Sequence, residues 1–142
     1  MDLRHGAASL EGTSPTLSEL VALCSQLRVD VRSAPLPSGW LGAYDHTAAR
    51  ILLLPGLTPV EQRSVLAHEL GHALRMDTGD SAAAERAAER FAALLLIDPA
   101  ALKAAVAWAR DETELAEELG VTVDIVRSYL ALRPRPALLR AA

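Results

Sequence analysis

The segment HELGH at residues 68–72 is the part of this sequence whose residue types and spacing could do chemistry. Residues four apart, such as His68 and His72, lie on one face of a helix with Cβ atoms about 6 Å apart. Two imidazoles so placed can bind one metal ion at the usual zinc–nitrogen distance of about 2.0–2.1 Å. Glu69 lies beside that face, where it can reach a water molecule held by the metal. Zinc lowers the pKa of such a water toward about 7, so Glu69 could take its proton while hydroxide attacks a carbonyl.

A catalytic zinc site needs a third protein ligand and one open position. In a tight hairpin of two antiparallel helices, His72 and Glu85 each lie about one turn, roughly 6 Å, from the connecting turn. Glu85 is then level with His72, and Glu89 is level with His68. We therefore predict that Glu85 is the third ligand of a single zinc ion. Glu89 is placed to accept the second ring N–H of His68.

Other interpretations of these residues remain. Two histidines could stand four apart by chance, although the chain has only four histidines in all. Glu85 and Glu89, each followed by an arginine, could be surface charges on an alanine-rich helix, or Glu89 could be the ligand. Asp77 and Asp80 are further candidates, but both are better explained as turn and cap residues.

Capping signals and apolar periodicity predict the elements that position these residues. Thr58, Pro59 and Glu61 form a capping box with proline in the first turn, which starts the helix that contains HELGH. The same signals place helices at about 16–27, 58–76, 81–97, 98–110, 112–119 and 123–132. Short strands are expected at 29–32, 40–44 and 50–54. We expect the strand 50–54 at the edge of its sheet, where an extended substrate could pair with it.

The length of 142 residues predicts a single domain of the α+β class. A small, mostly antiparallel sheet of about three strands should pack on a helical body, with the metal between two helices. Residues 1–13 and 133–142 are expected to be exposed tails.

Charge and composition exclude several classes of protein. The formal net charge of −4 argues against a chain whose main task is to coat nucleic acid. Cys24 is the only cysteine, so the chain can form no internal disulfide. Residues 1–16 contain no apolar segment typical of an export signal, and no apolar run is long enough to span a membrane. We therefore expect a cytoplasmic protein.

Two further features could contribute to function. Tyr44 and His46 precede the strand that leads to the metal helix, and either could stabilise the oxyanion formed on an attacked carbonyl. In the alternative interpretation, Tyr44 is a loop tyrosine that packs its ring against the protein, and His46 is a solvated histidine. Residues 112–132 resemble a helix-turn-helix with glycine in the turn. Since they offer few side chains that could contact bases, we favour two packed helices that complete the fold.

The sequence resembles the ImmA/IrrE family of zinc metallopeptidases. The matching stretches are VLAHELGHAL at 65–74 and ExxAxxFAAxLL at 85–96, and the similarity covers roughly residues 16–132. At position 89 this chain has Glu where the family often has Asp or Asn. The resemblance implies a zincin-like fold with the HExxH helix, zinc held by His68, His72 and Glu85, and catalysis by Glu69.

Relatives in this family are implicated in cutting helix-turn-helix repressors in mobile-element immunity or stress responses. The resemblance therefore implies that a repressor is the protein substrate. Two other classes stay open. One is a metal-stabilised module that binds a repressor without cutting it, and the other is a DNA-binding regulator that uses residues 112–132. A structural zinc usually has four protein ligands and needs no base, so an intact Glu69 argues against the first.

Overall fold

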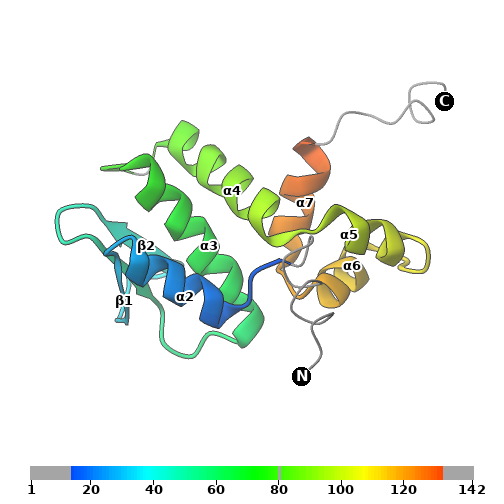
Figure 1. Cartoon of the computed structure of the whole chain (residues 1–142), viewed down its shortest axis with the longest axis horizontal. Coiled ribbons are helices and arrows are strands. Elements are labelled where there is room, and N and C mark those ends of the chain that lie inside the picture. Colours follow the sequence, from blue (N-terminus) through cyan, green and yellow to red (C-terminus); the bar gives the residue numbers. More distant parts are fainter. Residues whose placement is uncertain (1–13, 80, 133–142) are drawn as a thin grey trace.

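The computed structural model describes residues 14–79 and 81–132 of the chain, and the predicted tails and Asp80 lie outside these ranges. The described part combines helices with one small sheet, which confirms the α+β class (Figure 1). The helices are Leu17–Gln26 (α2), Pro59–Arg75 (α3), Ala82–Leu96 (α4), Pro99–Val106 (α5), Glu112–Leu119 (α6) and Val123–Leu132 (α7). The strands are Asp30–Ser33 (β1), Gly42–Asp45 (β2) and Arg50–Leu53 (β3).

The sheet is mixed, with strand order β1-β3-β2. β3 pairs antiparallel with β2, as expected, and parallel with β1. The prediction that residues 50–54 form an edge strand is therefore wrong, because β3 is central. Its side chains Ile51 and Leu53 are buried, whereas those of β1 and β2 are exposed or half-buried. A near-continuous apolar run such as RILLL is typical of a strand with neighbours on both sides.

The helices begin where the capping signals predicted. Thr58 accepts a hydrogen bond from the N–H of Glu61, whose side chain accepts one from the N–H of Thr58. Thr16 and Glu19 form the same box at the start of α2. The helix predicted at 98–110 is shorter than expected, because α5 ends at Val106 and not near residue 110. Both the Trp108 and Ala109 N–H groups donate to the carbonyl of Ala105, and the chain turns there.

α3 is the central helix of the molecule and packs against α2, α4 and the strands β2 and β3. α4 lies along it (Figure 1). The two helices approach closely at Gly71, where an added Cβ would lie 3.1 Å from the Cα of Ala88. Gly71 therefore lets the two halves of the predicted metal site come together. Around this contact the core is aliphatic, and its largest fully buried side chains include Leu20, Ile51, Leu66, Leu70, Leu96 and Ile125.

A polar cross-link ties the C-terminal helices to α3. The half-buried guanidinium of Arg63 donates to the carbonyls of Pro15 and Gly120, each at 2.8 Å, and to the hydroxyl of Ser14 at 2.7 Å. The buried hydroxyl of Ser64 accepts the N–H of Thr122 at 3.2 Å. These bonds hold the start of α7 beside the middle of α3, one turn before His68.

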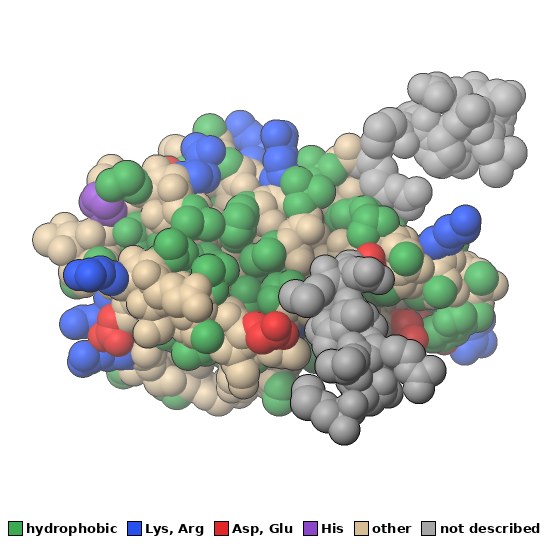
Figure 2. All heavy atoms as spheres, in the orientation of Figure 1, with side chains coloured by type: hydrophobic (Ala, Val, Ile, Leu, Met, Phe, Trp, Pro, Cys, Tyr) green, Lys and Arg blue, Asp and Glu red, His purple; other side chains and the backbone are tan. Residues whose placement is uncertain are grey.

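Hydrophobic side chains also reach the surface. Figure 2 shows them gathered across the middle of the face that carries α2, while Lys and Arg lie mainly toward its periphery. Exposed Val21 and Leu27 belong to this helix and its end. Within the described residues, the longest helices are too short or too polar to cross a bilayer.

Candidate metal centre

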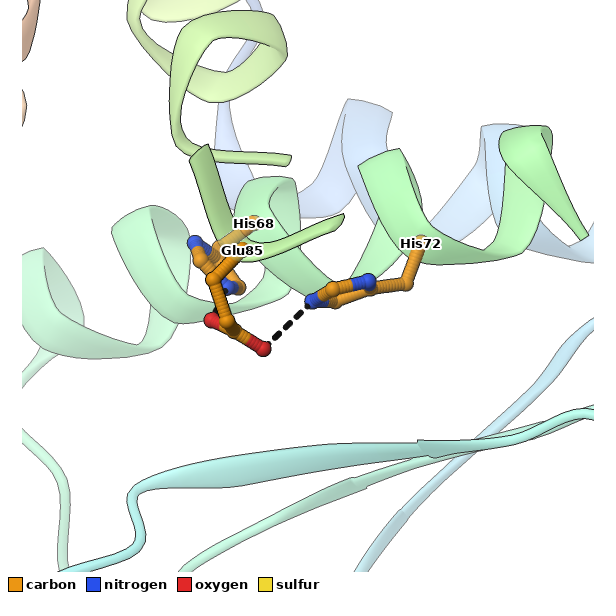
Figure 3. A group of neighbouring side chains, drawn as sticks. All are labelled: His68, His72 and Glu85. Atoms are coloured by element: carbon orange, nitrogen blue, oxygen red, sulfur yellow. Dashed lines mark hydrogen bonds and ion pairs between the residues drawn. The ribbon is translucent and has the colours of Figure 1, made fainter. Parts of the chain in front are cut away.

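Three side chains from α3 and α4 converge on one point. The Nε2 atom of His68 lies 2.9 Å from Oε2 of Glu85, and the Nε2 atom of His72 lies 3.0 Å from Oε1 of the same carboxylate. One donor atom from each residue lies within 4.8 Å of the other two. Figure 3 shows both imidazoles directed at the Glu85 carboxylate. The structure thus brings together the three residues that the sequence predicted as ligands.

The other nitrogen of each imidazole faces a second carboxylate. Nδ1 of His68 lies 3.1 Å from Oε2 of Glu89, and Nδ1 of His72 lies 2.9 Å from Oδ2 of Asp77. When Nδ1 of each ring donates its hydrogen to the carboxylate that it faces, the neutral imidazole keeps a lone pair on Nε2, the atom directed at Glu85. The predicted position of Glu89 against His68 agrees with this arrangement.

These donors fit a divalent cation. With both Nδ1 atoms protonated, two nitrogen lone pairs and a carboxylate meet at one place, and three acceptors repel one another unless a cation lies between them. Two imidazoles and one carboxylate are a usual zinc ligand set that leaves the fourth position open. Two ligand atoms of one zinc ion lie roughly 3.3 Å apart, which is close to the 2.9 and 3.0 Å that separate the two Nε2 atoms from the Glu85 carboxylate.

The pKa values describe a site that attracts positive charge. Burial alone would lower the pKa of His68. The hydrogen bond to Glu89 and the charges of Glu69, Glu89 and Glu85 outweigh it and raise that pKa to about 9. The hydrogen bond from His72 holds the pKa of Asp77 below its ordinary value, with help from Arg75. A cation at the Nε2 atoms would replace the proton that this field favours.

Asp77 is a site residue whose contact the sequence analysis missed. α3 ends in a left-handed residue, Met76 with φ of 57°, so that the N–H of Asp77 turns back to the carbonyl of His72 at 3.0 Å. This is a Schellman ending, which usually has glycine at the left-handed position. The turn places the Asp77 carboxylate against the ring of the same histidine. The residue is a turn residue, as predicted, and it also holds His72.

Glu69 is buried beside the three converging residues, with only 7% of its surface exposed. Burial raises the pKa of its carboxyl group, and the neighbouring His68 and His72 partly offset that effect. The strand β2 crosses directly over it at Gly42, where an added Cβ would lie 3.1 Å from Cγ of Glu69 and 2.5 Å from Cγ1 of Val65. A side chain at position 42 would have to displace the Val65 side chain or the strand itself, so glycine suits this close approach.

The site opens into a cleft of about 560 Å³. One wall is β2 with the residues before it, the floor is α3, and the other walls are α4, the turn after α3 and the start of α7. Its lining residues include Trp40, Tyr44, His68, Glu69, His72, Asp77, Glu85, Glu89 and Asp124. A cleft of this size can hold several residues of an extended polypeptide.

Tyr44 and His46 have different positions. Tyr44 lines the cleft, and His46 is not among its lining residues. The Tyr44 hydroxyl lies 3.0 Å from Nδ1 of His46. Burial raises the pKa of Tyr44, and Asp45 adds to the effect. Of the two oxyanion candidates, the structure therefore brings Tyr44 to the cleft. His46 does not line the cleft and contacts the Tyr44 hydroxyl.

The sequence of residues 24–130 matches the peptidase M78 family, described as the IrrE N-terminal-like domain. The match covers most of the chain, including α3, α4 and every residue of the metal centre. The chain belongs to this family. This match confirms the family resemblance that the sequence indicated. Peptidases of the M78 family are metal-dependent, which agrees with the three converging side chains that could hold a metal ion.

A search of curated proteins gave no match for this M78 chain. Among solved structures, a Mycobacterium tuberculosis transcriptional regulator is similar, with a TM-score of 0.63 and 20% sequence identity. The similarity covers 91% of this chain and 46% of that one, so this chain spans about half the length of the regulator. At this identity the likeness shows a shared fold.

Proposed function

We propose that this chain is a zinc-dependent endopeptidase that cuts a helix-turn-helix repressor in the cytoplasm. The observation that carries the proposal is the convergence of His68, His72 and Glu85 in an open cleft, with the buried carboxylate of Glu69 beside them. Family membership supports the class of reaction. The repressor as substrate rests on the resemblance to ImmA/IrrE proteins alone.

In the proposed mechanism, the two Nε2 atoms and the Glu85 carboxylate would hold zinc, while Glu89 and Asp77 fix the orientation of the two imidazoles. Zinc held there would supply the chemistry of a Lewis acid, polarising the scissile carbonyl and lowering the pKa of the attacking water. Glu69 accepts a proton from the attacking water. It then returns that proton to the leaving amine, as a general base that becomes a general acid. Tyr44 is placed to donate a hydrogen bond to the developing oxyanion.

We propose that β2, and not β3, captures the substrate. The N–H of Leu54 donates to the carbonyl of Leu41. This bond shows which of the paired residues of β2 and β3 are hydrogen-bonded to each other and which are not. In the alternating pattern that follows, Ala43 and Asp45 bond to β3, so the N–H and C=O groups of Gly42 and Tyr44 point away from the sheet. An extended segment could pair with these groups directly above Glu69.

Proline at position 44 should test this capture. It removes an outward N–H without breaking a bond to β3, and proline is tolerated at such edge positions. We expect Tyr44→Pro to lower turnover about 3- to 10-fold below Tyr44→Ala, since one hydrogen bond is lost. The alanine variant is the control for the missing ring, and zinc content should be equal in both. Equal turnover would place capture elsewhere.

Zinc removal tests the proposed function as a whole. We expect one zinc ion per chain by elemental analysis, because three ligands meet at one place. A chelator should abolish cleavage of the purified cognate helix-turn-helix repressor, and one equivalent of zinc should restore it. Magnesium should not restore cleavage, since it prefers oxygen ligands. A chain that takes up no transition metal on titration would contradict the proposal.

A DNA-binding role for α6 and α7 has less support. The buried face of α7 carries Ile125, Val126 and Tyr129, and its first turn lines the cleft. α7 also packs on α4. Its exposed face bears one cationic side chain, Arg127, which pairs with Glu112 at 3.3 Å. We therefore propose that these helices complete the peptidase fold.

A further inference from the structure

The first turn of α7 and the residue before it line the same cleft as β2. These lining residues are Thr122, Asp124 and Ile125. The bond from the Thr122 N–H to the Ser64 hydroxyl, together with the Arg63 bond to Gly120, fixes this turn to α3. A segment that resembles a helix-turn-helix in sequence thus contributes side chains to the candidate active site.

The carboxylate side chains that line the cleft give it a strong excess of negative charge. Five carboxylates line the cleft, those of Glu69, Asp77, Glu85, Glu89 and Asp124, and no lysine or arginine within residues 14–79 and 81–132 lines it. Arg75 approaches Asp77 from outside at 3.3 Å. With all five ionised, Arg75 and one zinc ion would offset three negative charges and leave two.

Asp124 differs from the other four carboxylates. Each of the others lies in the metal cluster, contacting a histidine or buried beside one. Asp124 is exposed, and within residues 14–79 and 81–132 it forms no ion pair, whereas Arg127 of the same helix pairs with Glu112. An acidic residue in a first turn also favours its own helix, through the helix dipole. That role does not require it to face the cleft, as it does here.

We propose that Asp124 is a specificity-determining residue that selects a lysine or arginine side chain of the bound polypeptide. The inference rests on the proposed function, since it assigns the charge of the segment that the peptidase cleft accepts. The segment lies between β2 and α7, with its backbone paired to Gly42 and Tyr44. Its cationic side chain points across the cleft to Asp124. Charge complementarity of this kind adds selectivity more than raw affinity.

The test uses a randomised mixture of synthetic 12-residue peptides with blocked ends. Peptides retained on zinc-loaded Glu69→Gln protein, which should bind without cutting, are sequenced by mass spectrometry. We expect lysine and arginine to be enriched about 3- to 5-fold over the input at one position, as a partly exposed ion pair allows. The enrichment should fade between about 0.1 M and 1 M salt, where the screening length falls from roughly 10 Å to 3 Å.

Charge changes at Asp124 should alter this preference. In the Glu69→Gln background, Asp124→Lys should replace the enrichment by one for aspartate and glutamate. Asp124→Asn, which disturbs the helix less, should abolish it without reversal. Glu117→Lys is the matched control, because Glu117 is exposed on α6 and is not among the cleft-lining residues. An enrichment that is absent, or unchanged in Asp124→Asn, would overturn the inference.

A parallel digestion of the same mixture by the unsubstituted zinc-loaded chain separates the two proposals. Retention of cationic peptides without any cleavage would refute the peptidase function and leave the charge selection standing. Cleavage without charge preference would support the peptidase function and refute the charge selection by Asp124.

Discussion

Replacing Glu69 by glutamine should lower the rate of repressor cleavage by at least about 10²-fold while one zinc ion remains bound. An amide has nearly the size of a carboxylate but cannot accept a proton from the attacking water, and loss of a positioned general base typically costs 10²–10⁴-fold. Glu69 does not belong to the three residues whose donor atoms converge, so zinc affinity should change little. A cleavage time course and elemental analysis on the same preparation measure both quantities.

The control for this variant is Glu117→Gln, the same change on an exposed face of α6. It should cleave at the unsubstituted rate. Binding of the repressor to Glu69→Gln should persist, because the capturing strand and the cleft walls are unchanged. If Glu69→Gln cut the repressor as fast as the control, the general base would be another group.

Zinc affinity should fall in a definite order when the carboxylates around the site are removed. Glu85→Ala deletes one of three ligands, and we expect a loss of more than about 100-fold. Glu89→Ala and Asp77→Ala leave the ligands in place but free one imidazole each, for which losses of about 10–100-fold are typical. A competition titration against a chromophoric chelator gives all three values on one scale.

Arg86→Ala is the matched control for the α4 variants, since Arg86 follows Glu85 in the sequence, is exposed, and is not among the cleft-lining residues. It should bind zinc as tightly as the unsubstituted chain. A larger loss for Glu89→Ala than for Glu85→Ala would move the third ligand one turn along α4. That result would contradict the hairpin geometry from which Glu85 was predicted.

The parts of the site that the sequence predicted depend on local geometry. His68 and His72 face the same way because a helix repeats every 3.6 residues, and Glu85 is level with them because a short turn joins two capped helices. The capping box at Thr58 set the start of α3 correctly. Such signals lie within a few residues of the feature that they determine, so they can be recognised without the fold.

The parts that were not predicted depend on tertiary structure or on an unusual backbone. Asp77 reaches His72 only because Met76 adopts a left-handed conformation, which the sequence would have indicated only with glycine at that position. β3 lies in the middle of the sheet because the chain passes from β1 to β2 before returning between them. Asp124 reaches the cleft because Arg63 and Ser64 hold α7 against α3, across some 57 residues of sequence.

Hydrolysis of a peptide bond at this metal centre can be observed directly with purified proteins. The zinc-loaded chain and its Glu69→Gln variant are each incubated with the purified cognate repressor, and new amino termini are identified by mass spectrometry over time. We predict one defined new terminus that accumulates with the unsubstituted chain at least about 10²-fold faster than with the variant. If the repressor stays intact with both proteins while both relieve repression, the protein is a repressor-binding module with a structural metal, and the proposed peptidase activity is wrong.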